Sequence, residues 1–324
     1  MIVEQTPKQI QDFIYNNKIC IVTNSRCMPG TTFLASMRSY LDYVPLHNFM
    51  IIPGYNTKNH APYYGEEAFS YMIVTLYEKK FDYAIYIDDD CFISNMSALI
   101  EEFKKFMNSG KCLAGVQDGT VICHRNHSQI FINAFISFWN IKDLKINKFL
   151  EERNKLVNFT FNYKEFKKDI NSELYQELIS NAKESTIRIK EYRENTYKKE
   201  VPYASVVRND PNNPIEPHQI PYSTDDDKAE SNAEPYYATE QALVIATGKP
   251  IYYMFGTDLY DPTEKSEMDN SGLTSVVMTS AEHIPFAYHT WFSRMYTKWP
   301  QSQVQLYHTK RINSIIKNIN FSVI

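Results

Sequence analysis

Short apolar runs alternate with amphipathic segments through the first third of the chain. The apolar runs are rich in β-branched and aromatic residues, as buried strands are, and they occupy 18–23, 49–52 and 82–87. The segments between and after them repeat apolar residues with a helical period, which predicts helices over 31–43, 66–80 and 95–108. Because strands that alternate with helices form mostly parallel sheets, the pattern predicts an α/β fold.

The pattern changes in the middle of the chain. Residues 142–199 carry long charged helical patterns without a strand signal, and residues 201–235 are rich in Pro, Asn and Asp. Apolar runs typical of a core return at 241–246 and 250–254. We therefore expect a single domain over 1–324, interrupted by a helical and loop insertion at 143–235.

Three consecutive carboxylates follow the apolar run that ends at Ile87, namely Asp88, Asp89 and Asp90. Their mutual repulsion and partial burial oppose folding unless a cation or several donors neutralise them. Extended backbone puts Asp88 and Asp90 on one side and Asp89 on the other, so the first two can converge on one ion. Oxygen ligands at a loop suit Mg²⁺ or Mn²⁺. A structural alternative is that the triplet caps the helix that follows, although that helix also has Asn95 or Ser97 as a cap.

Charge and composition narrow the function classes. The net charge of −4 argues against nonspecific nucleic-acid binding. The 24 Tyr and 19 Phe offer stacking surfaces for sugars or bases, and they fit a general bias toward tyrosine equally well. A second triplet, Asp225–Asp227, has polar neighbours and is interpreted as a solvated charge run.

Cysteine usage and the apolar runs bear on location. The five cysteines form neither a CxxC pair nor a zinc-like spacing, which is typical of reduced thiols in a cytosolic protein. The first 18 residues are polar, and no apolar run reaches the length of a membrane span. We therefore expect a cytoplasmic protein, in which the four glycosylation sequons are chance matches. Residues 283–324 are basic and aromatic, which indicates either a solvated amphipathic face or a peripheral contact with anionic lipid at the inner membrane face.

The chain lacks both glycine-rich motifs that cradle phosphate, so a bound nucleotide diphosphate would need a metal. Together with the segment Thr23–Arg26 and the Asp triplet, this resembles the metal-dependent glycosyltransferases of the GT-A fold, whose DxD motif the triplet matches. The resemblance implies a single Rossmann-like domain that binds a nucleotide sugar, with the insertion at 143–235 on the side of the acceptor substrate.

Three further segments resemble the glycogenin and lipopolysaccharide galactosyltransferase group, in the same order. Residues 131–140 resemble its F-N-A-G-V segment, with Phe135 in place of the glycine. Residues 239–243 are similar to its D-Q-x-x-L segment, with Glu240 in place of the aspartate. Residues 287–291, followed by Lys298 and Trp299, resemble its metal histidine and phosphate lysine segments. The family uses Mn²⁺ or Mg²⁺, usually takes a UDP-sugar and retains the anomeric configuration.

The resemblance also implies roles for individual residues. The expected metal ligands are Asp88, Asp90 and His289, with Asp88 contacting either the ion or the ribose. The expected donor contacts are Thr23, Asn24, Arg26, Asp89 and Lys298, with Arg294 as an alternative to Lys298 at the phosphate. The expected catalytic residues are Asn133, Glu240 and Gln241, where Glu240 acts on the sugar or, in an inverting enzyme, as the base.

Structural explanations remain open for several of these residues. His289 lies among aromatic residues and could be a core histidine, and Asn133 could be a turn or helix residue. Glu240 could be an acid that the dipole of a helix N-terminus favours, and Lys298 could be a surface charge.

The sequence therefore predicts a hexosyltransferase of polysaccharide or glycoconjugate synthesis, acting from a UDP-hexose on a saccharide or lipid-linked saccharide. A haloacid-dehalogenase-like phosphatase shares the D-x-D pattern, but its motif lies near the first strand. A sugar-nucleotide pyrophosphorylase would have a glycine-rich, basic loop after its first strand, and residues 24–30 match such a loop poorly. From a different class, the chain could be a noncatalytic carbohydrate- or nucleotide-binding protein with a degenerate transferase fold.

Overall fold

The computed structural model describes residues 2–25, 34, 36–53, 55–56, 61–62, 65–118, 128, 130–155, 170–197, 236–260 and 273–290. Its α-helices are α1 (Pro7–Asn16), α3 (Gly65–Glu78), α4 (Met96–Ser109), α6 (Ile146–Lys155), α8 (Ser172–Tyr197) and α9 (Tyr237–Thr247). Two 3₁₀ turns are η1 (Leu41–Tyr43) and η2 (Leu46–Asn48). The strands are β1 (Ile19–Ser25), β2 (Phe49–Pro53), β3 (Tyr55–Asn56), β4 (Ala61–Pro62), β5 (Tyr83–Ile87), β6 (Cys91–Ile93), β7 (Leu113–Gln117), β8 (Ile132–Asn140), β9 (Ile251–Tyr260), β10 (Leu273–Met278) and β11 (Pro285–Thr290).

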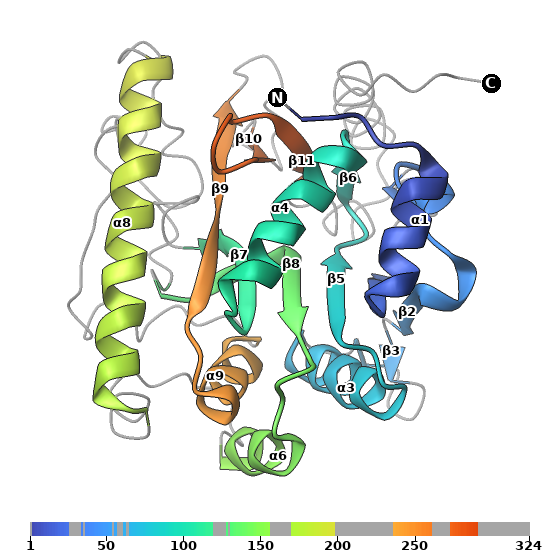
Figure 1. Ribbon diagram of the computed structural model, residues 1–324. Helices are drawn as coiled ribbons and strands as arrows, with labels where there is room; N and C mark the ends of the chain where they lie inside the picture. Colours follow the sequence, from blue (N-terminus) through green and yellow to red (C-terminus); the bar gives the residue numbers. More distant parts are fainter. Residues whose placement is uncertain are drawn as a thin grey trace.

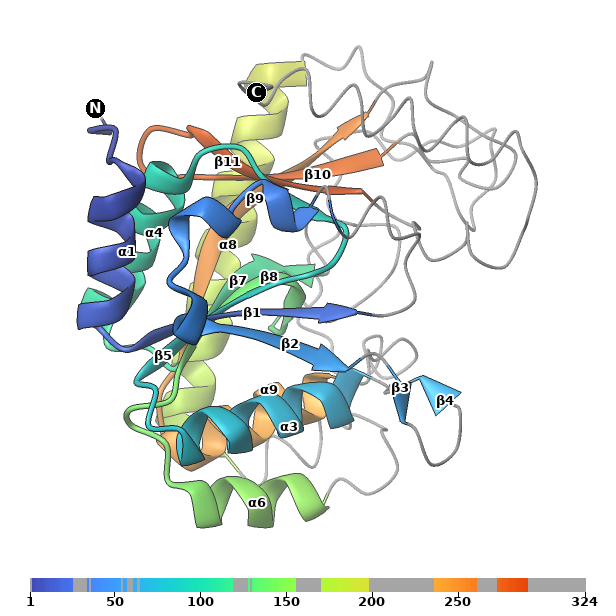
Figure 2. The same ribbon diagram turned by 90° about the vertical axis from the view of Figure 1, so that its right-hand side faces the viewer.

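Helices cover both faces of a central sheet, with α1 and α4 on one side and α3, α6 and α9 on the other (Figures 1 and 2). The alternation along β1 explains this layering, since successive side chains of a strand point to opposite faces. Ile19 and Ile21 pack in the core beneath α1 and α4, whereas Cys20 and Val22 pack in the core beneath α3 and α9. A strand that is apolar on both faces is thus buried on both.

The sheet has nine strands in the order β2-β1-β5-β8-β7-β9-β10-β11-β6. The predicted parallel pairing is confirmed for β2, β1 and β5, and for β7 with β9. It is wrong for the remaining ladders, which are antiparallel, so the fold is a mixed α/β fold. Only residues 279–284 connect β10 to β11, which is too short for the crossover that a parallel pair requires.

The sheet curls so that two consecutive strands occupy distant places in it. β5 is third in the strand order and β6 is ninth, yet only Asp88, Asp89 and Asp90 separate them in the chain. In Figure 2, β10 and β11 lie above β7 and β8, and β1 and β2 lie below them. The Asp triplet therefore joins the parallel part of the sheet to its antiparallel part.

Most elements predicted in the first third of the chain are present. The predicted strands correspond to β1, β2 and β5, and the last two predicted helices to α3 and α4. The Asn95 side chain caps α4 by accepting a 2.8 Å hydrogen bond from the Ala98 amide. The Asp triplet does not cap this helix, because β6 intervenes. In the predicted helix 31–43, residues 31–33 and 35 lie outside the described residues, residues 34 and 36–38 are helical, and the last three residues form the 3₁₀ turn η1.

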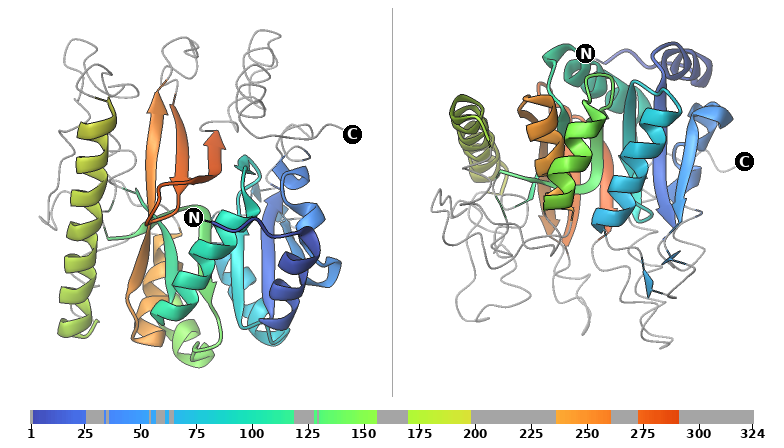
Figure 3. Two further views of the ribbon diagram at one scale, coloured as in Figure 1. Left: turned by 45° about the horizontal axis from the view of Figure 1, so that its top comes forward. Right: turned by 90° about the horizontal axis from the view of Figure 1, so that it is seen from below.

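Within 143–235 the described residues are helical, in α6 and α8, and the second triplet at 225–227 lies outside them. Helix α8 stands beside β9 at the margin of the molecule (Figures 1 and 3). Gln117, the last residue of β7, donates a 3.2 Å hydrogen bond to the Ala182 carbonyl and accepts one from Thr186. The helix is thereby fixed to the sheet.

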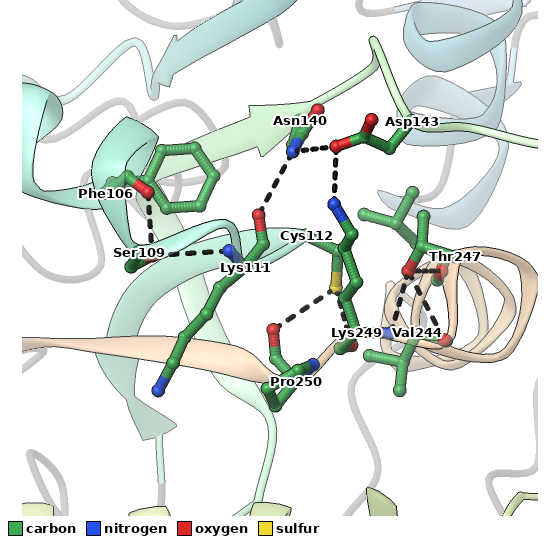
Figure 4. A network of polar contacts seen from close by, with 11 residues as sticks. Phe106, Ser109, Lys111, Cys112, Asn140, Asp143, Val244, Thr247, Lys249 and Pro250 are labelled. Atoms are coloured by element: carbon green, nitrogen blue, oxygen red, sulfur yellow. Dashed lines mark hydrogen bonds and ion pairs between the residues drawn. The ribbon is translucent and has the colours of Figure 1, made fainter.

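A polar network closes the end of the sheet away from the Asp triplet, where β8 ends and β7 and β9 begin (Figure 4). Lys249 donates a 2.6 Å hydrogen bond to the Asp143 carboxylate, which also accepts one from Asn140. This bond to Lys249 lowers the pKa of Asp143. The network connects the end of α9 to the sheet. The Asp triplet lies at the opposite end of the sheet.

The β10–β11 hairpin is fixed to α4 through a buried carboxylate. Glu102 accepts hydrogen bonds from the Ser280 amide at 3.1 Å, from the Lys105 ammonium at 3.1 Å and from the Tyr252 hydroxyl at 2.9 Å. At the other side of the hairpin, the Ser94 amide donates to the Phe286 carbonyl. These contacts hold β11 against β6.

No helix in the described ranges combines the length and apolar character that crossing a membrane requires.

Cys20, Cys91 and Cys112 are buried free thiols. Burial raises the pKa of Cys20 and of Cys112 to about 12.

Candidate functional site

Two carboxylates and an imidazole converge where the sheet curls. One side-chain ligand atom each from Asp88, Asp90 and His289 lies within 4.8 Å of the others. Strand pairing brings them together, because β11 runs antiparallel to β6 and His289 is opposite Cys91, the residue after Asp90. The Nε2 atom of His289 is 3.1 Å from Oδ1 of Asp90. Asp90 and His289 are both buried, each with 6% of its surface exposed.

Neighbouring donors fix the Asp88 carboxylate. Its Oδ1 atom accepts hydrogen bonds from the Asn24 amide at 3.2 Å, the Tyr86 hydroxyl at 3.1 Å and the Asp89 backbone N–H at 3.1 Å. The Asn24 amide also contacts the Tyr86 hydroxyl. Three donors to one oxygen fix the orientation of the Asp88 carboxylate.

These three residues fit a divalent cation. Carboxylate oxygens suit Mg²⁺ and Mn²⁺, and an imidazole nitrogen in the set is compatible with a transition metal such as Mn²⁺. The negative charge of the cluster acts on its neighbours. The pKa of the Cys91 thiol is raised well above its ordinary value, first by burial and then by the charges of Asp90 and Asp88.

A second acidic cluster is built around Asp118, which directly follows β7 and is fully buried. One carboxylate oxygen accepts a 3.0 Å hydrogen bond from the Asn133 amide. The other accepts hydrogen bonds from the Tyr237 hydroxyl at 2.6 Å and the Tyr236 hydroxyl at 3.4 Å. Tyrosines at the start of α9 thus hold the Asp118 side chain from one side, and β8 holds it from the other.

Glu240 lies close to this cluster, in the first turn of α9. It is completely buried, and its Oε2 atom accepts a 3.1 Å hydrogen bond from the Ile132 amide. Burial raises its pKa well above the ordinary value, although the hydrogen bond from Ile132 opposes this shift and the charge of Asp118 adds to it. Within the described part of the chain, Oε1 of Glu240 and Oε1 of Gln241 have no hydrogen-bond partner. Two adjacent buried acceptors without donors are unusual in a folded protein.

Strand β8 connects the two clusters. Asn133 contacts Asp118, and two residues later the Phe135 carbonyl accepts a 2.8 Å hydrogen bond from the Asp88 amide. The Phe135 ring stacks on the imidazole of His289, with centroids 4.5 Å apart and planes 3° from parallel. Residues 133–135 of β8 therefore contact both acidic clusters.

The structure brings most of the predicted site residues into these two clusters. Asp88, Asp90 and His289 form the first, with Asn24 acting on Asp88, and Asn133 and Glu240 contribute to the second. Asp89 and Gln241 are buried next to them in the chain, and Thr23 is buried in β1 opposite Ile51. Arg26, Arg294 and Lys298 lie outside the described residues.

The positions of Asn133 and Glu240 bear on the structural alternatives for these two residues. Asn133 is in a strand, so its interpretation as a turn or helix residue is wrong. Glu240 does lie in the first turn of a helix, as the alternative supposed, but it is buried with one oxygen on a strand amide.

Sequence reasoning missed Asp118, Tyr236 and Tyr237. Asp118 follows the apolar run Leu113–Val116 and Gln117, which is the same strand-end signal that singled out the Asp triplet. The two tyrosines had no comparable signal, because their role depends on the placement of α9 against β7.

Comparisons with known proteins add little. No protein-family model matches the chain. No curated protein matches it significantly. Among solved structures, it is similar to a glycosyltransferase involved in the glycosylation of the major capsid of PBCV-1. That similarity has a TM-score of 0.32 at 17% identity and covers 46% of this chain and 72% of the other. A similarity of this size is too weak to assign a function.

Proposed function

We propose that the chain is a metal-dependent glycosyltransferase of the GT-A type. It moves a hexose from a nucleotide diphosphate sugar, with UDP as the expected nucleotide, to a saccharide, glycolipid or other glycoconjugate. The observation that carries the proposal is the convergence of Asp88, Asp90 and His289 from two distant parts of the chain. A DxD pair by itself is a common sequence pattern. Here a histidine from β11 lies beside the pair, and the three side chains together can ligate a metal ion.

Asp88, Asp90 and His289 would hold the ion, Mn²⁺ or Mg²⁺. A bound divalent ion supplies the positive charge that neutralises a leaving diphosphate, which is the main electrostatic requirement of glycosyl transfer. Asn24 and Tyr86 hold the Asp88 carboxylate in one orientation. Asp90 is held next to His289, so the two side chains are already close together without a ligand. Arg26 and Lys298 remain proposed contacts to the nucleotide.

The second cluster fits the transferred sugar. A sugar hydroxyl both donates and accepts hydrogen bonds, and Oε1 of Glu240 and Oε1 of Gln241 have no partner among the described residues. Asp118 and Asn133 would extend this polar surface toward β8. The raised pKa of Glu240 favours its protonated form, in which Oε1 would donate to a sugar hydroxyl because Oε2 accepts from the Ile132 amide, so this side chain is better suited to orient a hydroxyl than to remove a proton.

Thermal unfolding tests the proposal. We expect UDP or a UDP-sugar to raise the Tm when Mn²⁺ is present and to have no effect in EDTA. A ligand that binds only the folded state adds about 2.7 kcal/mol at 100 times its Kd, which gives a measurable shift. Inorganic phosphate is the control, since a phosphatase should respond to it at least as strongly as to UDP. The absence of a shift with every nucleotide and nucleotide sugar would reject the transferase and leave a noncatalytic protein.

A further inference from the structure

Phe135 reaches the first cluster because β8 separates from β7. The β7–β8 register runs to Gly115 opposite Ser137 and resumes at Val116 opposite Asn133, so residues 134–136 of β8 have no counterpart in β7. The pairing with β5 continues through this segment, with Ile87 opposite Ile136 and then the Asp88 amide on the Phe135 carbonyl. The segment therefore follows β5 to its end, where the Asp triplet begins.

The Phe135 side chain then covers one face of the His289 imidazole. The two rings are nearly parallel, with centroids 4.5 Å apart, and only 2% of Phe135 is exposed. A histidine ring turns easily about its outer side-chain torsion, since that torsion has broad minima. A ring packed flat against it restricts this rotation, because tilting the imidazole would drive its edge into the phenylalanine.

We propose that Phe135 is a positioning residue for the metal site, which holds the His289 ring in the plane that directs Nε2 toward Asp90. This inference rests on the proposed function, because it concerns the same three ligands. The geometry that supports it is the combination of the flat stack with the 3.1 Å approach of Nε2 to Asp90. Outer contacts of this kind orient metal ligands and affect metal affinity strongly.

The side chain and the backbone of Phe135 act separately. Its carbonyl accepts the hydrogen bond from the Asp88 amide, and this bond survives any substitution of the side chain. Its ring is the part that contacts His289. Substituting the side chain therefore tests the stack while Asp88 keeps its backbone contact.

The test compares Phe135→Leu with Phe138→Leu. Phe138 lies on the same strand, three residues further on, is also buried and packs against Phe103 and Phe106 of α4 in the same core cluster as Phe135. Mn²⁺ binding to the full chain is measured by electron paramagnetic resonance. We expect Phe135→Leu to weaken Mn²⁺ binding about tenfold or more and Phe138→Leu to leave it unchanged.

A second readout needs no metal. In the metal-free protein the phenylalanine ring should shift the His289 ring protons upfield, and Phe135→Leu should remove this shift while Phe138→Leu preserves it. The His289 signals are identified by their loss in His289→Gln, among the eight histidines of the chain. If Phe135→Leu does not fold, Phe135→Met replaces it, and the wild-type spectrum still reports the stack.

The outcomes are distinguishable. Equal Mn²⁺ affinity in wild type and Phe135→Leu, or equal losses in both leucine variants, would overturn the role of Phe135 and leave the metal site intact. Wild-type protein that does not bind Mn²⁺ would overturn the metal site of the proposed function, and the role of Phe135 with it. Ring protons of His289 without an upfield shift would contradict the stack itself.

Discussion

Asp90→Asn is expected to reduce metal-dependent sugar transfer by about two to three orders of magnitude. Asp90 is buried, lies 3.1 Å from the imidazole of His289 and comes from the turn that joins β5 to β6. Asparagine has nearly the same shape but no negative charge, so the fold should persist while the site loses both a ligand and part of its attraction for a cation. The measurement is the initial rate with UDP-sugars across a range of Mn²⁺ concentrations.

The same change at Asp143 serves as the control. Asp143 is an aspartate at the opposite end of the sheet, where it bonds to Lys249 and Asn140 (Figure 4). Asp143→Asn should leave the rate and its Mn²⁺ dependence unchanged. Full activity in Asp90→Asn at low Mn²⁺ would contradict the assignment of Asp90 as a ligand.

Glu240→Ala is expected to lower the free energy of unfolding by about 2–4 kcal/mol, whereas Glu240→Gln should fold normally. Alanine removes the acceptor of the buried Ile132 amide and leaves a cavity in a region without exposed surface. Glutamine keeps an acceptor for that amide. Urea unfolding in EDTA measures both variants without interference from a metal.

The stability of wild type relative to Glu240→Gln should depend on pH in a definite direction. Burial raises the pKa of Glu240 in the folded state above its ordinary value of 4.5, so the folded protein keeps a proton that the unfolded chain releases. The contribution of Glu240 to stability is therefore complete below pH 4.5 and is lost as the pH rises through the folded pKa. Glutamine does not titrate. Wild type should lose stability relative to Glu240→Gln as the pH rises above 4.5 toward the raised pKa of Glu240 in the folded state, and a constant difference would contradict a raised pKa.

Sequence patterns predicted the fold best where local and long-range requirements agree. The strands β1 and β5 are apolar on both faces and are buried on both faces, so periodicity and burial give the same answer. The edge strand β2 was predicted from the same apolar pattern, although its Ile51 is 44% exposed. The antiparallel half of the sheet was missed. Its pairing depends on where β9, β10 and β11 meet β6, which is a long-range property that no local pattern contains.

The residues of the candidate site also differ in how far the sequence alone could predict them. The Asp triplet could be singled out because three adjacent charges after an apolar strand conflict with stability, a conflict that is visible in the sequence. His289 was found through a family resemblance, and its place beside Asp90 follows from the curl of the sheet. Phe135 stood out as a departure from the resembled segment, but only the structure supplies a reason for a phenylalanine there, the stack on His289. Asp118 needed the position of α9 before its surroundings could be known.

The central claim is that Asp88, Asp90 and His289 together bind a divalent ion. The most direct measurement is the anomalous scattering of manganese in a crystal of the full chain grown with Mn²⁺ and UDP. The account predicts a single strong peak within bonding distance of Asp88, Asp90 and His289, with the diphosphate on the same ion. Manganese bound elsewhere, or UDP bound without an ion between these three side chains, would contradict it.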